Sequence, residues 1–193
     1  MPPIELPTVR SPNSCEKVVG LVNQLWQSVS AEPTFAVDVV RSGEIPPPYR
    51  ELLVHEHDMT STLTRHYGEP IALRVVDRSV DSGWLARCSI LEVARTGRPI
   101  EFGVIRINLP VLREPIRAEV LEGHVPLGGL LNEYGVGYRS CPGGFLRVRS
   151  NGAISDAFGL SGATWLYGRC NCLSDLSDRT IAEVVEILPP VNN

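Results

Sequence analysis

The chain has 193 residues, 43% hydrophobic and 21% charged, with a formal net charge of −4; this is typical of one globular domain and excludes a disordered chain, a fibre and a disulfide scaffold. The acidic balance, without a run of basic residues, disfavours a nucleic-acid partner. Because the sequence has neither a signal-peptide pattern nor the ~20 consecutive apolar residues of a membrane span, we predict a cytoplasmic protein that does not contact a membrane.

The N-terminal part of the chain predicts a proline-rich arm followed by short helices and one short strand. Residues 1–12 are expected to form a loose arm, and residues 13–193 a single domain. Apolar side chains at helical spacing, together with capping residues and closing glycines, mark the helices. The expected elements are a helix over residues 14–29, a strand at Phe35–Val40, a helical turn at Tyr49–Val54, and a helix that Asp58 caps and Gly68 ends.

From Ile71 onward the sequence alternates apolar and polar residues, which predicts strands. Polar turns at Thr96–Arg98 and Ser174–Asp178 join two pairs of them into hairpins. One expected strand begins at Ile71, and the others span Trp84–Ala94, Ile100–Leu109, Phe145–Arg149, Trp165–Leu173 and Thr180–Leu188. Short helices are expected at Glu114–Leu121 and Pro126–Tyr134. Hairpin-linked strands with few helices favour an α+β domain built on an antiparallel sheet.

Two pairs of side chains raise the question of a metal. Cys170 and Cys172 are separated by one residue, as are His55 and His57. Zinc ligand pairs usually have two to four residues between them. We therefore favour reduced cysteines that pack as small apolar side chains, and we expect neither a metal nor a cofactor.

Arginine dominates the basic residues, since Lys17 is the only lysine among 18 lysines and arginines. A compositional bias explains most of this excess. Arg87 is different, because it lies in a predicted strand and shares a face with Leu85 and Leu91. A charge on an apolar face needs a partner, which is either a structural glutamate or a ligand. A guanidinium binds a carboxylate through two parallel hydrogen bonds.

Two glutamates in the last strand provide a candidate acid. Glu183 and Glu186 are three residues apart, so they point to opposite faces and one of them is expected to face the core. A carboxyl group in an apolar cavity has a raised pKa and can donate or accept a proton. The alternative is a solvated or arginine-paired glutamate.

Seven short segments between residues 49 and 189 form a recognisable series: Leu52–His55, Asp58–Thr60, Trp84–Arg87, Thr96–Pro99, Pro126–Gly128, Tyr167–Arg169 and the glutamate strand before Leu188–Pro189. In their order and spacing they resemble the chorismate lyase family, which makes 4-hydroxybenzoate and pyruvate from chorismate.

The resemblance implies a sheet of about six antiparallel strands with helices over one face, a buried small-molecule ligand, and a cofactor-independent lyase of ubiquinone or other aromatic acid biosynthesis. Arg87 and the Met59 N–H would hold the ring carboxylate, while the Leu127 N–H and a glutamate would meet the opposite end. The residues so assigned are Arg87 and Glu186 as catalytic, and Met59, Thr60, Arg87, Leu127, Gly128 and Glu183 as substrate-binding, with Glu183 the rival of Glu186.

A second function remains open for the same fold. It is also similar to the ligand-binding domains of some transcriptional regulators, which sense small molecules without chemistry. Residues 1–45 contain no basic helix-turn-helix pattern, so this alternative is a binding or sensor protein for an aromatic acid.

Overall fold

A computed structural model describes residues 12–191, so nearly all of the predicted arm lies outside the described residues. The described residues form seven strands, which are β1 (Val37–Val40), β2 (Ile71–Asp81), β3 (Trp84–Val93), β4 (Arg98–Asn108), β5 (Tyr138–Arg149), β6 (Trp165–Asp175) and β7 (Thr180–Ile187). They make one sheet in the order β1-β5-β6-β7-β4-β3-β2, and every neighbouring pair is antiparallel. The predicted α+β class and antiparallel sheet are confirmed, and each of the seven strands expected from the sequence pattern is present, one more than the family resemblance implied.

Six α-helices accompany the sheet in the described residues. They are α1 (Pro12–Gln27), α2 (Tyr49–Leu53), α3 (Met59–Tyr67), α4 (Ile116–Glu122), α5 (Leu127–Glu133) and α6 (Gly152–Phe158). The predicted caps of α3 are confirmed: the Asp58 side chain accepts a hydrogen bond from the Ser61 N–H, and Gly68 ends the helix at φ 64°. No helix within residues 12–191 is long and apolar enough to cross a membrane.

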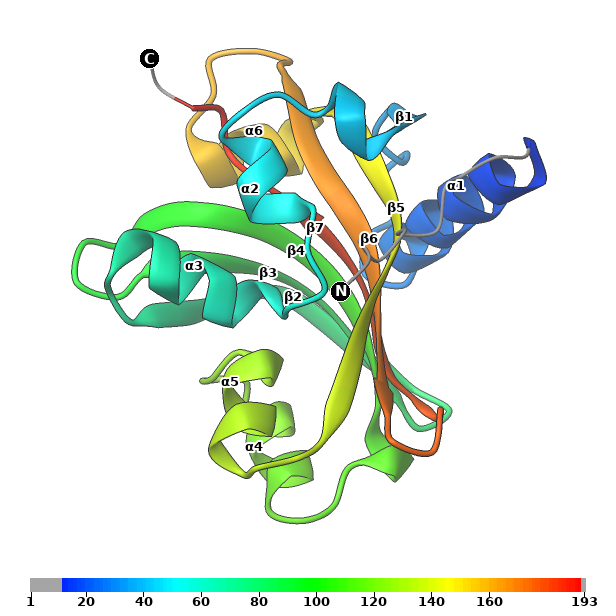
Figure 1. Cartoon of the computed structure of the whole chain (residues 1–193), viewed down its shortest axis with the longest axis vertical. Helices are drawn as coiled ribbons and strands as arrows, with labels where there is room; N and C mark the ends of the chain where they lie inside the picture. The colour runs from blue at the N-terminus through cyan, green and yellow to red at the C-terminus, as the bar shows by residue number, and fades with distance from the viewer. Residues whose placement is uncertain (1–11, 192–193) are drawn as a thin grey trace, which may run out of the picture.

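The helices are divided between the two faces of the sheet rather than gathered on one. Figure 1 shows the sheet curving around α3, α4 and α5, with α1 on its outer side. Apolar residues of α1 and α6 form one core with the outer face, including Val22, Trp26 and Ile154. The central strands β3 and β4 are buried on both faces, so their apolar pattern does not reveal which face a given helix covers.

The inner face carries two apolar clusters instead of one. The first packs α4 and α5 against strand residues such as Ile107 and Leu173. The second packs α2 and α3 against Leu91, Ile100 and neighbouring residues. The sheet surface between these clusters bears polar and charged side chains, and it is there that the candidate site lies.

Two elements fall in the glycine-rich stretch of residues 135–163, where only Phe145–Arg149 was expected to be a strand. β5 begins seven residues earlier, at Tyr138, and crosses Pro142 at an irregularity in its pairing with β6. α6 was not expected, although Asn151 caps it and Gly159 ends it at φ 64°. A proline next to glycines indicates a turn, and here a bulge accommodates it within a strand.

Candidate functional site

Strand register places the polar residues of the inner face in adjacent cross-strand rows. Along β3, β4, β7 and β6, one row consists of Arg87, Ile105, Val184 and Asn171. The next row, which we call the glycine row, consists of Ser89, Gly103, Glu186 and Arg169. A further row pairs Leu91 with Glu101. Residues distant in the sequence therefore share one patch, because antiparallel partners lie about 4.5–5.5 Å apart.

Gly103 makes space in the middle of this patch. A Cβ at that position would lie 3.0 Å from Glu101 Oε1 and 3.7 Å from Ser89 Oγ. The missing side chain therefore leaves room over the glycine row, and the Glu101 carboxyl group extends into it. A cavity of about 60 Å³ lies above, lined by all three rows.

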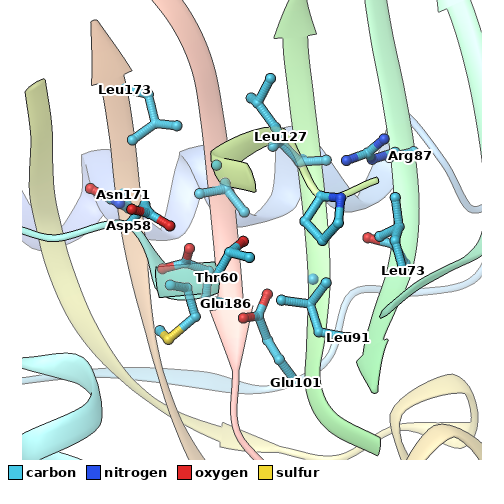
Figure 2. A pocket seen from close by; sticks show the side chains of 17 residues that line it. Asp58, Thr60, Leu73, Arg87, Leu91, Glu101, Leu127, Asn171, Leu173 and Glu186 are labelled. Carbon is cyan, nitrogen blue, oxygen red and sulfur yellow. The ribbon is translucent and has the colours of Figure 1, made fainter. Parts of the chain in front are cut away.

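The roof of the cavity comes from the starts of two helices. Asp58, Met59 and Thr60 line it at the start of α3, and Leu127 and Gly128 line it at the start of α5. All four residues expected at the helix starts, Met59, Thr60, Leu127 and Gly128, thus surround one cavity together with Arg87 and Glu186. Figure 2 shows these side chains converging from the sheet and the helices.

Arg87 brings an unpaired cation to the cavity wall. Its side chain is buried, with 3% of the residue exposed, and its Nε and Nη1 atoms have no hydrogen-bond partner. Burial lowers the pKa of Arg87 to about 10, so the guanidinium stays charged at neutral pH. Among the described residues no carboxylate forms a salt bridge with it. Of the two partners expected for Arg87, a structural glutamate or a ligand, the glutamate is therefore not found within residues 12–191.

A second buried arginine has its full set of partners. Arg169 is 0% exposed, and its Nε donates to Glu186 Oε2 at 2.5 Å. The same guanidinium donates to the carbonyl oxygens of Leu53, His55 and His57. Arg169 therefore fastens the loop before α3 to the sheet and holds the Glu186 carboxylate in the cavity wall. The sequence assigned no role to Arg169.

Glu101 is a cavity residue that the sequence interpretation missed. It is 5% exposed, and its Oε2 atom has no hydrogen-bond partner. Burial raises the pKa of Glu101 well above its ordinary value, and the nearby Glu186 carboxylate raises it further. Burial also raises the pKa of Glu186, but Arg169 opposes that change. Of the two carboxyl groups, Glu186 is bonded to a cation and Glu101 is not, so burial favours the neutral form of Glu101 more strongly. Its alternation with Gly103 and Ile105 along β4 placed it on the cavity face.

Glu183 and Glu186 do lie on opposite faces of β7. Glu186 lines the cavity, whereas Glu183 forms an ion pair with Arg106 at 2.5 Å on the outer face, where Arg106 also stacks over the Trp84 ring. The structure thus separates the two candidate carboxylates and leaves Glu183 outside the cavity, because residues three apart in a strand cannot share a face.

Asp58 joins the two helices of the roof. Tyr138 Oη donates to its Oδ2 at 2.9 Å, and Asn132 Nδ2 lies 3.4 Å from the same oxygen. Burial acts to raise the pKa of Asp58, but hydrogen bonds from Ser61, Tyr138 and Asn132 outweigh it and hold the pKa below its ordinary value. We call Asp58, Ser61, Asn132 and Tyr138 the Asp58 latch. It ties α3 to α5 and β5.

The cysteine and histidine pairs do not form a metal centre. The described residues contain no group of three or more His, Cys, Asp or Glu side chains placed to hold a metal ion. All five cysteines are free, and Cys170 packs in the core under α1. The His55 and His57 rings stack at 5.8 Å, beside the carbonyl groups that Arg169 holds.

No family model matches the sequence, and no curated protein does. Solved structures with a similar fold include PhnF from Mycobacterium smegmatis, with a TM-score of 0.55 and 12% identity, over 70% of this chain and 65% of that one. The chain thus spans less than two thirds of PhnF. The effector domain of PhnF alone has a TM-score of 0.52 and 12% identity, over 69% of this chain and 88% of that one. At such identities the similarity shows a common fold, and it does not show a common activity.

Proposed function

We propose that this protein binds a small ring carboxylic acid in the cavity between the sheet and the starts of α3 and α5. The observation that carries the proposal is the Arg87 guanidinium, which is buried at the cavity wall with two nitrogen atoms unpartnered. Burying a cation without a partner costs several kcal/mol. A ligand carboxylate on Arg87 offsets that cost through two parallel charge-assisted hydrogen bonds.

The charges of the cavity provide one site for a ligand carboxylate. Arg169 and Glu186 neutralise each other, and burial together with Glu186 raises the pKa of Glu101, which favours its neutral form. The Asp58 carboxylate is occupied by its latch partners. Arg87 is therefore the one uncompensated charge that the described wall residues present to a ligand. The apolar remainder, including Leu73, Leu91 and Ile105, suits a ring.

Ligand entry requires the roof to move. The cavity of about 60 Å³ is much smaller than the roughly 300–1,000 Å³ that small-molecule pockets usually have. The roof is formed by two short helix starts that the Asp58 latch joins. We propose that α3 and α5 separate to admit the ligand. A sensing function is favoured by the fold, since the effector domain of PhnF shares it.

Titration calorimetry with 4-hydroxybenzoate and with chorismate tests the binding. The wild type is expected to bind at least one of them, and Arg87→Met is expected to abolish binding. Arg106→Met is the matched control, because Arg106 is an ion-paired arginine on the opposite face and should leave the affinity unchanged. Equal affinities for the wild type and Arg87→Met would overturn the proposal.

Elimination of pyruvate from chorismate is the second candidate function. The observation that favours it is the presence of Glu186 and Leu127 in the same cavity as Arg87. With the ring carboxylate on Arg87, the ether bond between the ring and the enolpyruvyl oxygen would break while the ring loses a proton and becomes aromatic, and the departing enolpyruvate would take up a proton to become pyruvate. Glu186 would contact the oxygen at the far end of the ring, and the Leu127 N–H would stabilise charge on it.

Pyruvate release separates the two candidate functions. Purified protein is incubated with chorismate, and pyruvate is followed through its reduction by lactate dehydrogenase and NADH. Turnover that Arg87→Met removes and Arg106→Met retains supports the lyase. Binding of chorismate or 4-hydroxybenzoate without release of pyruvate supports the sensor.

A further inference from the structure

We infer that Glu101 is a neutral hydrogen-bond donor on the cavity floor, and that it selects ligands with an oxygen acceptor at the end opposite their carboxylate. The inference rests on the proposed function, because it takes Arg87 as the site of the ligand carboxylate. It adds a second anchoring point and thereby narrows the class of ligand from ring acids to ring acids that carry a distal hydroxyl, ether or keto oxygen.

Arg87 and Glu101 lie at separate positions along the same face of the sheet. Arg87 pairs with Ile105 across β3 and β4, and Glu101 lies four positions before Ile105 on β4. At about 3.4 Å per residue, the Cα positions of the two residues are roughly 14 Å apart along the sheet. Both side chains line the same cavity, and Figure 2 shows them apart, with Arg87 near the top right and Glu101 near the bottom. A ring with substituents at its 1 and 4 positions can present one substituent to each side chain.

The carboxyl group of Glu101 lies next to the space left by Gly103 and near three charged side chains. The Gly103 gap lets its carboxyl group lie over the glycine row, with Oε1 at 3.0 Å from the position of an added Cβ. The charged groups that act on it are Glu186, Arg169 and Asp58. Arg169 is already bonded to Glu186 and to three carbonyl oxygens, and Asp58 is bonded within the latch.

Oε2 of Glu101 is buried and has no hydrogen-bond partner among the described residues. A protonated carboxyl group has one O–H donor, and an oxygen of a ligand in the cavity can accept from it, in competition with the Glu186 carboxylate. Leaving such a donor without an acceptor is unfavourable, so a ligand that lacks the distal oxygen is penalised. A residue that only filled the floor would not distinguish ligands of equal shape.

The test compares 4-hydroxybenzoate with 4-methylbenzoate, which has nearly the same shape and no distal oxygen. Calorimetry at pH 7 is expected to show that the wild type prefers 4-hydroxybenzoate by about tenfold or more, since polar sites reject analogues that leave their groups unpaired. Glu101→Gln keeps an N–H donor and should keep the preference. Glu101→Leu should lose it, and Glu183→Gln, on the opposite face, is the control that should not change it.

The outcomes separate the inference from the proposed function. Equal affinity of the wild type for both acids overturns the role of Glu101 and leaves the Arg87 site standing. Absence of binding for both acids overturns the two together. Because the comparison is made first on the wild type, the result does not depend on the folding of any variant.

Discussion

The backbone of Gly128 lies against the carboxylate of Asp58, so that a Cβ on Gly128 would stand 2.6 Å from Asp58 Oδ1. The carboxylate cannot turn aside, because it accepts hydrogen bonds from the Ser61 N–H and from Tyr138 Oη. Gly128 therefore lets the start of α5 approach the start of α3. The roof of the cavity depends on this contact.

Replacing Gly128 by alanine should push the two helix starts apart. We expect Gly128→Ala to lower the free energy of unfolding by about 1–3 kcal/mol, the usual cost of overpacking, as measured by urea denaturation. Gly129→Ala is the matched control, because its Cβ would meet only Val125 Cγ1, at 3.4 Å. The control should be neutral or slightly stabilising, since alanine favours a helix. An equal loss in both variants would contradict the contact described.

Replacing Arg87 by methionine should stabilise the free protein while it removes ligand binding. The unpaired buried guanidinium is replaced by an apolar side chain of similar length, and such replacements of buried charges gain about 1–4 kcal/mol. Urea denaturation without ligand gives the stability. Arg106→Met, which breaks a partly exposed ion pair, should change it by less than ~1 kcal/mol. A destabilised Arg87→Met would mean that Arg87 has a structural partner.

Breaking the ion pair of Arg169 and Glu186 should be costly. Arg169→Met leaves the buried Glu186 carboxylate uncompensated and frees the loop before α3, so we expect a loss of about 3–5 kcal/mol. Adding Glu186→Gln removes the stranded charge and should recover part of the loss, which a double-mutant cycle measures. The exposed pair of Arg74 and Glu92 is the control, with an expected cost of at most ~1 kcal/mol. If the changes in the free energy of unfolding caused by Arg169→Met and by Glu186→Gln simply add in the double variant, the two side chains are not coupled.

His55 should make the fold sensitive to acid. Its Nε2 lies 2.8 Å from Leu52 O, and its Nδ1 lies 3.2 Å from both the His57 N–H and Arg169 Nη1. Because donors face Nδ1, the ring is neutral with its proton on Nε2. Burial, and then the charge of Arg169, lower the pKa of His55 from 6.5 to about 4.

The sign of the pH effect follows from this lowered pKa. The unfolded chain protonates His55 near pH 6.5, before the folded protein does, so the stabilisation is complete above pH 6.5 and is lost as the pH falls toward 4. Between pH 7 and 5 the wild type should lose roughly 1 kcal/mol more than His55→Gln, because the partial exposure of His55 reduces the effect of the full shift. Urea denaturation at the two pH values measures the difference. Identical pH dependence in the two proteins would rule out His55 as the sensitive group.

The sequence predicts those parts of the site that depend on local pattern. Alternation along one strand places Arg87 on a buried face, and capping signals locate the starts of α3 near Asp58. The pairing of Arg169 with Glu186 depends instead on the register of β6 against β7. The nearness of Glu101 to Glu186 depends likewise on the register of β4 against β7, which pairs Gly103 with Glu186. Register between strands is a tertiary property, so neither relationship can be read from the residues of one strand.

The sequence also does not predict which face of the sheet α1 covers. The apolar stripe of α1 predicts only that the helix packs against an apolar surface. The central strands β3 and β4 are buried on both faces, so burial of the strands does not show which face a helix covers. In the structure α1 packs with α6 on the outer face, while α4 and α5 pack on the inner face.

If α3 and α5 separate as proposed, the Asp58 latch also controls how fast a ligand exchanges. A ligand larger than the cavity of about 60 Å³ would then enter and leave only while the two helices are apart. Both the association rate and the dissociation rate then contain the same opening step. Loosening the latch, for example with Tyr138→Phe, which removes a 2.9 Å hydrogen bond, should shorten the residence time and speed association together. The dissociation constant, as the ratio of the two rates, would change little.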